Sequence, residues 1–199
     1  MCTSPYDHLH SLDDFYQDAR HGRLPSVSLI TPDIAFASEG EYQDDQIGEA
    51  LTATVYNAVS SGPQWPGTLF VVVWDEGGGF YDHVPPPPAV APDDVPPDTT
   101  VPPDQPGGFD RYGFRVPCLV ASPYSKPGYV SSVIYDHTSI TATIEHKWNL
   151  PPLTNRDAAA APLWDFLDLE GPPAFLTPPA LPEPAMWPFT GLTKSRPGG

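Results

Sequence analysis

Basic side chains are scarce in this chain. It has 199 residues, with 9 Lys and Arg against 25 Asp and Glu, which gives a formal net charge of -16. Nucleic-acid phosphates and anionic membrane surfaces repel a protein of this charge. The composition therefore excludes both as passive electrostatic partners. An anionic substrate would need a bound metal ion to offset the negative field.

Cysteine is also rare, and long apolar runs are missing. The two cysteines, Cys2 and Cys118, cannot build a disulfide framework and do not have zinc-ligand spacing. Cys118 lies in an apolar strand pattern, so we expect a buried small hydrophobic residue rather than a nucleophile. No apolar run is long enough to cross a bilayer, and residues 1–10 lack the basic and apolar regions of a signal peptide.

Proline is abundant instead, with 29 residues concentrated in two regions. Hydrophobic residues nevertheless make up 40% of the chain, so it can bury a core and is not simply disordered. Residues 85–108 are predicted to form a long Pro-rich loop within a domain of residues 1–170, and residues 171–199 a Pro-rich tail. Three aromatic residues are candidates to anchor this tail: Phe175, Trp187 and Phe189.

Helices are predicted where apolar residues recur at helical spacing. The first covers residues 12–19, with Ser11 as its N-cap and Gly22 at its end. The second begins after Asp44 or Asp45 and buries one apolar face. Two more are expected over residues 140–148 and, as a short amphipathic helix, over residues 163–169. Strands are predicted at residues 24–30, 68–74 and 115–122.

The expected fold class is α/β. Residues 26–74 read as a strand, helix, strand unit, which normally forms two neighbouring parallel strands with a right-handed crossover. Residues 68–74 are nearly all apolar, as in a strand that is buried on both faces. We therefore expect a central, largely parallel sheet flanked by helices.

Two adjacent carboxylates follow this central strand. Asp75 and Glu76 should lie at the carboxyl edge of the sheet, where α/β proteins bind ligands. Neighbouring carboxylates near a core raise each other's pKa and resist desolvation unless a cation neutralises them. Glycines 77–79 allow a sharp turn and close approach to a bound group. The pattern indicates a metal or phosphate site, and the alternative is a strand that ends in a solvated acidic turn.

The sequence of residues 75–87, DEGGGFYDHVPPP, carries a resemblance. It resembles the signature of the phosphoesterase family that contains bacterial and plant phospholipases C and certain acid phosphatases, usually Asp-Glu-x-Gly-Gly-Phe-Tyr-Asp-His-Val. Further segments are similar in the same order, so the likeness covers about residues 12–169; they are residues 22–29, 47–50, 115–117, 122–128 and 137–140. The resemblance implies an alkaline-phosphatase-like core that hydrolyses phosphate esters at a metal site.

The resemblance also implies roles for four residues. Asp75 and Glu76 would be ligands of a divalent metal ion, and His83 and His137 would line the catalytic site. His137 falls at a predicted helix start, where backbone N–H groups favour an anion, although a histidine there is often only a cap or a packing residue. The implied substrate is a phosphate ester or a phospholipid head group.

The chain departs from the family in two ways. Family members have an N-terminal half that supplies a Glu-Asn metal-binding pair and a Ser or Thr nucleophile, and no segment here matches either. The chain thus resembles only the C-terminal portion, and the missing half is an implied partner. Gly40 and Glu41 stand where the family usually has His-Pro, so this chain does not match one active-site histidine of the family. No nucleophile is assigned, because none of the tempting hydroxyls lies where the family places one: Ser122, Ser125, Thr138 and Ser139.

Three functions are open at this point. The first is a metal-dependent phosphate ester hydrolase that is incomplete as an isolated chain. The second is a non-catalytic acidic remnant that keeps the sheet. The third is a Pro-rich interaction module, in which residues 85–88 dock on an aromatic groove. Family members are often secreted or periplasmic, but the sequence itself indicates no location.

Overall fold

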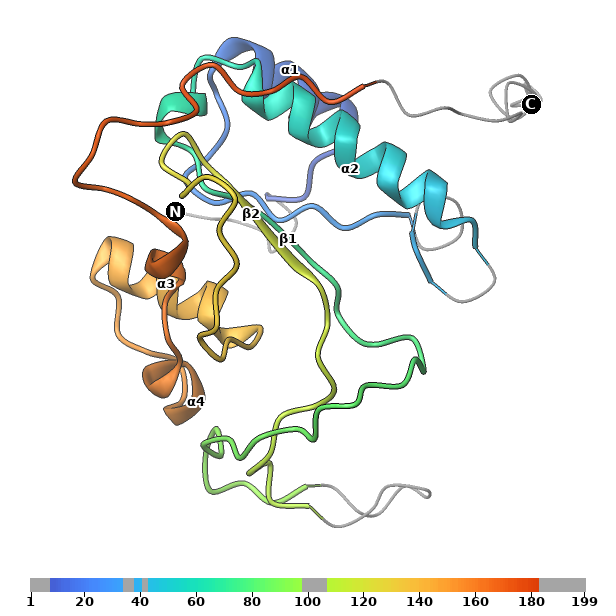
Figure 1. Cartoon of the computed structure of the whole chain (residues 1–199), viewed down its shortest axis with the longest axis vertical. Coiled ribbons are helices and arrows are strands. Elements are labelled where there is room, and N and C mark those ends of the chain that lie inside the picture. The colour runs from blue at the N-terminus through green and yellow to red at the C-terminus, as the bar shows by residue number, and fades with distance from the viewer. Residues whose placement is uncertain (1–7, 34–37, 41–42, 98–106, 183–199) are drawn as a thin grey trace. The chain divides into compact units, whose positions relative to one another are not determined.

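A computed structural model describes residues 8–33, 38–40, 43–97 and 107–182 (Figure 1). The chain is mixed α/β, with helices and a small two-stranded antiparallel sheet. It divides into two compact units, which comprise the described residues of Met1–Phe70 with Phe175–Gly199, and those of Val71–Ala174. No helix in the described ranges has both the length and the apolar character needed to cross a bilayer.

The first unit begins with α1, Leu12–His21. Ser11 Oγ accepts the Asp14 N–H at 3.1 Å, and Asp14 Oδ2 accepts the Ser11 N–H at 3.2 Å. This reciprocal pair is a capping box, which satisfies N–H groups that have no partner inside the helix. Gly22 ends α1 with a left-handed φ of 67°. The predicted helix, its cap and its terminating glycine are all confirmed.

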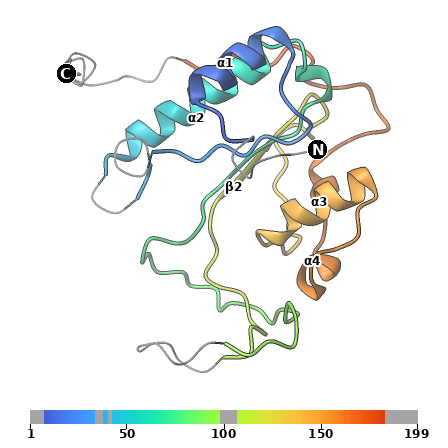
Figure 2. The same cartoon turned by 180° about the vertical axis from the view of Figure 1, so that it is seen from behind.

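Helix α2, Asp45–Ser60, packs beside α1 (Figures 1 and 2). Its N-cap is Asp44, whose side chain accepts the Gln46 N–H at 3.0 Å. One face of α2 is buried through Ala50, Val55, Tyr56 and Val59. Of the apolar residues expected on this face, Val55 and Val59 are buried, whereas Ile47, Leu51 and Ala58 are half-buried. The short 3-10 helix η1, Trp65–Gly67, follows it.

Trp65 connects this unit to the C-terminal segment. Its side chain is only 3% exposed, and its Nε1–H donates to the Phe175 carbonyl at 2.9 Å. Phe175 thus lies at an attachment point of the Pro-rich tail, through its backbone. The other two candidate anchors, Trp187 and Phe189, lie outside the described residues.

The sheet consists of β1, Phe70–Val73, and β2, Cys118–Ala121. The strands run in opposite directions, and the pairing continues with the Trp74 N–H donating to the Pro117 carbonyl at 3.4 Å. Both strands lie where the sequence predicts them. The prediction of a central, largely parallel sheet is wrong, because an apolar run does not specify its partner or the direction of pairing.

Two related predictions are also wrong. Residues 24–30 form no strand, so no parallel crossover connects them to β1. The Leu24 backbone is instead bound by the Gln64 side chain, which accepts its N–H at 2.8 Å and donates to its carbonyl at 3.0 Å. Cys118 is exposed rather than buried, because β1 and β2 are only half-covered or exposed in this structure.

The second unit also contains α3, Thr138–Trp148, and α4, Asn155–Ala159, which pack together with the 3-10 helix η2, Leu163–Phe166 (Figure 1). Helix α3 confirms the expected helix over residues 140–148. Helix α4 is not predicted, although its capping box of Thr154 and Asp157 is visible in the sequence. The helix expected over residues 163–169 is reduced to the short η2.

The Pro-rich loop folds back on itself in its described part. The Ala89 N–H donates to the Asp110 carbonyl at 2.7 Å, and the Tyr112 N–H donates to the Pro87 carbonyl at 3.0 Å. Residues 98–106 lie outside the described part. The two ends of the loop are therefore joined by an antiparallel bridge, between Pro88 and Arg111.

Candidate functional site

The end of β1 presents the two carboxylates that the sequence singles out. Asp75 and Glu76 are exposed. Each has one oxygen engaged locally: Asp75 Oδ1 accepts the Glu76 N–H at 3.1 Å, and Glu76 Oε2 accepts the Gly78 N–H at 2.8 Å. Gly78 and Gly79 have φ values of 58° and 79°, which non-glycine residues rarely adopt. The glycines therefore form the sharp turn that the sequence predicts.

His137 lies at the same end of β1, although it is 63 residues away in sequence. Its Nε2 is 2.9 Å from the carbonyl oxygen of Trp74, the residue directly before Asp75. A carbonyl can only accept, so Nε2 carries the hydrogen and Nδ1 is unprotonated in the neutral ring. The structure thus brings one predicted site histidine to the end of the strand that carries the predicted metal ligands.

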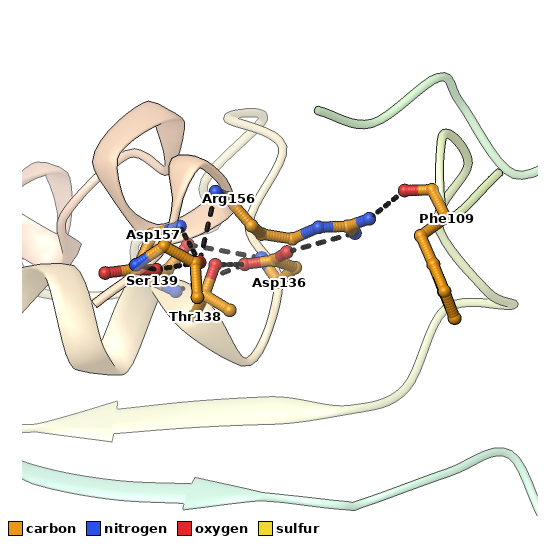
Figure 3. Close-up of polar contacts among 7 residues, drawn as sticks. Phe109, Asp136, Thr138, Ser139, Arg156 and Asp157 are labelled. Atoms are coloured by element: carbon orange, nitrogen blue, oxygen red, sulfur yellow. Dashed lines mark hydrogen bonds and ion pairs between the residues drawn. The ribbon is translucent and has the colours of Figure 1, made fainter. Parts of the chain in front are cut away.

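Asp136, the residue directly before His137 in the sequence, fixes the start of α3. Figure 3 shows its contacts with Thr138 and Ser139. Its Oδ1 accepts the Thr138 hydroxyl at 2.6 Å and the Ser139 N–H at 3.2 Å. The Asp136 N–H in turn donates to Ser139 Oγ at 3.2 Å. This reciprocal arrangement gives a partner to the Ser139 N–H, which has none inside the helix. It also fixes the backbone from which the His137 side chain extends.

His83 is held much less firmly. Its side chain is 80% exposed, and its Nδ1 is 3.8 Å from Asp82 Oδ1. The fixed member of this pair is Asp82, which binds the Arg115 guanidinium through two contacts of 2.8 Å. The hydrogen bond from Arg115 holds the pKa of Asp82 far below its ordinary value. The structure gives His83 no contact with His137 that would place both at one site.

A shallow open depression lies over this segment. Its volume is about 490 Å³, and residues from the glycine turn and from the chain leading into β2 line it: Gly77, Phe80, Tyr81, Asp82, His83, Arg115, Val116 and Pro117. Phe80 and Tyr81 are 83% and 89% exposed. The depression is lined by these aromatic residues together with charged Asp82 and Arg115 and one exposed histidine, so its walls are mixed apolar and polar. It is wide enough for a small group but does not enclose one.

Asp75 and Glu76 have the chemistry of metal ligands, but two carboxylates are too few to form a complete metal site. Oxygen ligands suit hard divalent cations, and each carboxylate keeps one oxygen outside the hydrogen bonds of the turn. Magnesium and calcium take six or more ligands. Within the described ranges, however, no three His, Cys, Asp or Glu side chains gather closely enough to hold a metal. Asp75 and Glu76 can therefore supply part of a metal site and no more.

Three functional candidates were not predicted from the sequence. Arg115 belongs to a family-like segment, but its contact with Asp82 spans 33 residues. Asp136 could have been found from the capping pattern that it forms with Ser139. Arg156, whose guanidinium approaches Asp136, has no sequence signal that would mark it.

Comparison with known proteins decides the family. A sequence profile described as "Phosphoesterase family" matches residues 4–151, well over half of the chain. The chain belongs to the phosphoesterase family. The matched range includes the ends of β1 and the start of α3, so both predicted metal ligands and both site histidines lie within it.

Curated relatives of this phosphoesterase agree with that assignment. Non-specific phospholipase C6 of Arabidopsis thaliana is 38% identical, with 89% of this chain and 37% of the relative covered. Non-specific phospholipase C3 of the same plant is 36% identical, with 75% of this chain and 31% of the relative covered. Phospholipase C A of Mycobacterium tuberculosis is 34% identical, with coverages of 69% and 28%. The chain thus spans about a third of the length of these relatives.

Proposed function

We propose that this chain carries part of the catalytic site of a phosphate ester hydrolase of the phospholipase C type. The carrying observation is the hydrogen bond from His137 Nε2 to the Trp74 carbonyl at 2.9 Å. It puts a candidate acid-base group at the strand end that presents Asp75 and Glu76. Membership of the phosphoesterase family and relatives named phospholipase C support the same reaction class.

The proposed roles follow from the chemistry of each side chain. Asp75 and Glu76 would bind a divalent metal ion, which when bound neutralises charge on phosphoryl oxygens. His137 has its Nε2–H committed to Trp74, so its Nδ1 is the atom that takes or returns a proton. The remaining metal ligands and the nucleophile belong to parts of the family fold that the described residues do not provide.

Measurement of metal binding and hydrolysis tests this proposal. The purified chain is titrated with Mg²⁺, Ca²⁺, Mn²⁺ and Zn²⁺ by calorimetry and incubated with p-nitrophenylphosphorylcholine and p-nitrophenyl phosphate. We expect Asp75→Asn and Glu76→Gln to weaken metal binding, and metal-dependent nitrophenol release to fall in both. Asp168→Asn is the matched control, because Asp168 is an exposed carboxylate of the same unit outside the site. Equal metal affinity in all four proteins would contradict the proposal.

A second candidate function is a non-catalytic acidic remnant. The observation that favours it is the missing third ligand: in the described part of the chain, Asp75 and Glu76 have no further acidic, histidine or cysteine partner for a metal. This candidate predicts weak cation binding with no ester hydrolysis. Metal-dependent turnover above the level of Asp75→Asn excludes it.

The Pro-rich docking function has less support. The carbonyls of Pro86 and Pro87 already accept hydrogen bonds, from the Arg111 guanidinium at 2.6 Å and from the Tyr112 N–H at 3.0 Å. A proline run that docks in an aromatic groove keeps an extended face available. Here one side of the run is paired with its own loop.

The fold of the complete protein is part of the proposal. We propose that the complete protein has the alkaline-phosphatase-like core that the resemblance implies. Its proposed substrates are phosphate monoesters, on which acid phosphatases act, and phospholipid head groups. The support is the family match over residues 4–151 and the mixed α/β content. A structure of a longer protein that contains this segment, in which β1 joins no larger sheet, would contradict it.

A further inference from the structure

Helix α4 presents one basic side chain toward the start of α3 (Figure 3). The Arg156 side chain is only 14% exposed, and its Nη1 is 3.8 Å from Asp136 Oδ2. Its Nη2 donates to the Phe109 carbonyl, and its guanidinium lies 5.3 Å from the centre of the Tyr112 ring. Arg156 therefore connects the C-terminal end of the Pro-rich loop to the residue directly before His137.

The two oxygens of Asp136 have separate tasks. Oδ1 accepts hydrogen bonds from Thr138 and Ser139 and so starts the helix. Oδ2 faces Arg156. A half-buried carboxylate is costly without a cationic or hydrogen-bonding partner, and a buried guanidinium needs an anionic one. The pair thus holds the carboxylate in the orientation in which its other oxygen caps α3.

Helix α4 is itself fixed on both sides. Its first N–H, from Asn155, donates to the Pro92 carbonyl in the loop at 2.9 Å. Asp157 closes the capping box with Thr154 and accepts the Leu153 N–H at 2.6 Å. Arg156 therefore extends from a short, well-anchored turn, which suits a side chain that has to hold another group in place.

Phe109 shows that the loop end depends on an external contact. Its φ of 52° lies in the left-handed region, which is unfavourable for an aromatic residue. Such a conformation persists when neighbouring groups over-determine it. The hydrogen bond from Arg156 to the Phe109 carbonyl is one such contact, so the same guanidinium orients the loop and the start of α3.

We propose that Arg156 is a positioning residue for His137: through Asp136 it sets the start of α3, and so it keeps the imidazole Nε2 on the Trp74 carbonyl. The positioning itself is independent of the reaction. Its consequence for turnover rests on the proposed function. A purely structural Arg156 would stabilise α4 and the loop but leave the environment of the His137 ring unchanged.

The environment of His137 can be measured without activity. Diethyl pyrocarbonate modifies accessible imidazole nitrogens, and mass spectrometry of peptides gives the rate at each histidine. His83 is an internal reference, because it is exposed and its neighbour Asp82 is bound by Arg115 rather than Arg156. In the wild-type chain we expect His137 to react more slowly than His83. The reagent attacks the unprotonated ring nitrogen, which in His137 is Nδ1, hindered by its own side chain, because Nε2 donates its hydrogen to Trp74. The exposed His83 ring can also present its less hindered Nε2.

The variants are Arg156→Met, Asp136→Asn and Arg156→Lys. Arg156→Met removes the guanidinium but keeps much of its volume. Asp136→Asn keeps an oxygen for the cap and removes the charge that faces Arg156. We expect both to raise the His137-to-His83 rate ratio by about fivefold, the size expected for losing one hydrogen bond. Arg156→Lys should restore part of the protection, because Lys keeps the charge but lacks the fork geometry.

The control is a second Arg and Asp pair. Arg23 binds Asp18 at 2.9 Å in the other unit, and Arg23→Met changes the net charge by the same amount. An unchanged rate ratio in Arg156→Met and Asp136→Asn would overturn the proposal, as would an equal rise in Arg23→Met. Circular dichroism identifies any variant that fails to fold. If Arg156→Met does not fold, the rate ratio of Asp136→Asn decides the test.

The same samples separate this proposal from the proposed function. A wild-type chain without ester hydrolysis, but with a rate ratio that rises in Arg156→Met, would contradict the proposed function and support the positioning role. A wild-type chain that hydrolyses p-nitrophenylphosphorylcholine, with an unchanged rate ratio in Arg156→Met and Asp136→Asn, would support the proposed function and contradict the positioning role.

Discussion

Arg115 binds Asp82 through two contacts of 2.8 Å, from Nε to Oδ2 and from Nη2 to Oδ1. The Asp82 side chain is only 11% exposed, and it also accepts the Val84 N–H at 3.0 Å. Bidentate pairs of this kind are shorter and more directional than single ionic contacts. The pair joins the segment after the glycine turn to the segment that leads into β2.

The first prediction concerns acid stability. Hydrogen bonds, chiefly from Arg115, lower the pKa of Asp82 from its ordinary value of 3.8. A lowered pKa in the folded state adds stability that is present above this value and is lost as the pH falls through the folded pKa. Asp82→Asn should therefore be less stable than the wild type at pH 7, with a smaller difference at pH 3. Urea midpoints at both pH values check this, and an equal difference at both would contradict it.

The second prediction concerns Glu145, which is buried next to Asp157. Glu145 is 6% exposed and Asp157 is 3% exposed. Both accept the Leu153 N–H, at 3.2 and 2.6 Å. Burial and the contact with Asp157 raise the pKa of Glu145 from 4.5. Burial alone would raise the pKa of Asp157 too, but hydrogen bonds from Thr154 and Leu153 lower it overall. Glu145 is therefore the member of the pair that keeps its proton longer.

The sign of the effect follows from that raised pKa. The stability that protonated Glu145 contributes is complete below pH 4.5 and is lost as the pH rises through the folded pKa. Glu145→Gln keeps a neutral side chain at every pH. We expect its melting temperature to exceed that of the wild type at pH 7, with the gain disappearing near pH 4. Glu170→Gln, at an exposed position, is the control and should show no such trend.

The third prediction concerns the contact between α1 and α2. A Cβ on Gly62 would lie 2.5 Å from the Ala19 carbonyl oxygen, which is backbone and cannot move aside alone. Gly62→Ala should therefore destabilise the first unit by about 1–3 kcal/mol, as overpacking does. Gly67→Ala meets no atom within 4 Å and should change stability by about 0.5 kcal/mol or less. Equal denaturant midpoints for the two variants would contradict this.

The fourth prediction ranks the two histidines. Once ester hydrolysis is established, His137→Gln should lower kcat by about 10²–10⁴-fold, the usual contribution of a positioned acid-base group. His83→Gln should have a smaller effect, because the His83 side chain is 80% exposed and only loosely held. Steady-state kinetics with p-nitrophenylphosphorylcholine measures both. A larger loss for His83→Gln would reverse the assignment.

Local signals in the sequence predicted the helices well. Ser11, Asp44 and Gly22 act within one turn of the helices that they cap, so their roles can be read from their neighbours alone. The glycine turn after Asp75 and Glu76 is equally local, because it depends on backbone freedom at residues 77–79. The positions of β1 and β2 also follow from apolar runs.

Pairing between distant residues was decided only by the tertiary structure. The sequence does not specify that β1 meets β2 in antiparallel fashion, that residues 24–30 form no strand, or that Cys118 is exposed. It also gives no sign of the contact between His137 and Trp74, or of Arg156 at Asp136. The sequence by itself determined the family, the caps of α1 and α2 and the carboxylate turn, since each rests on a contiguous segment. The side chains that meet at that turn are separated by tens of residues in the sequence, so only the folded chain decides which of them come together.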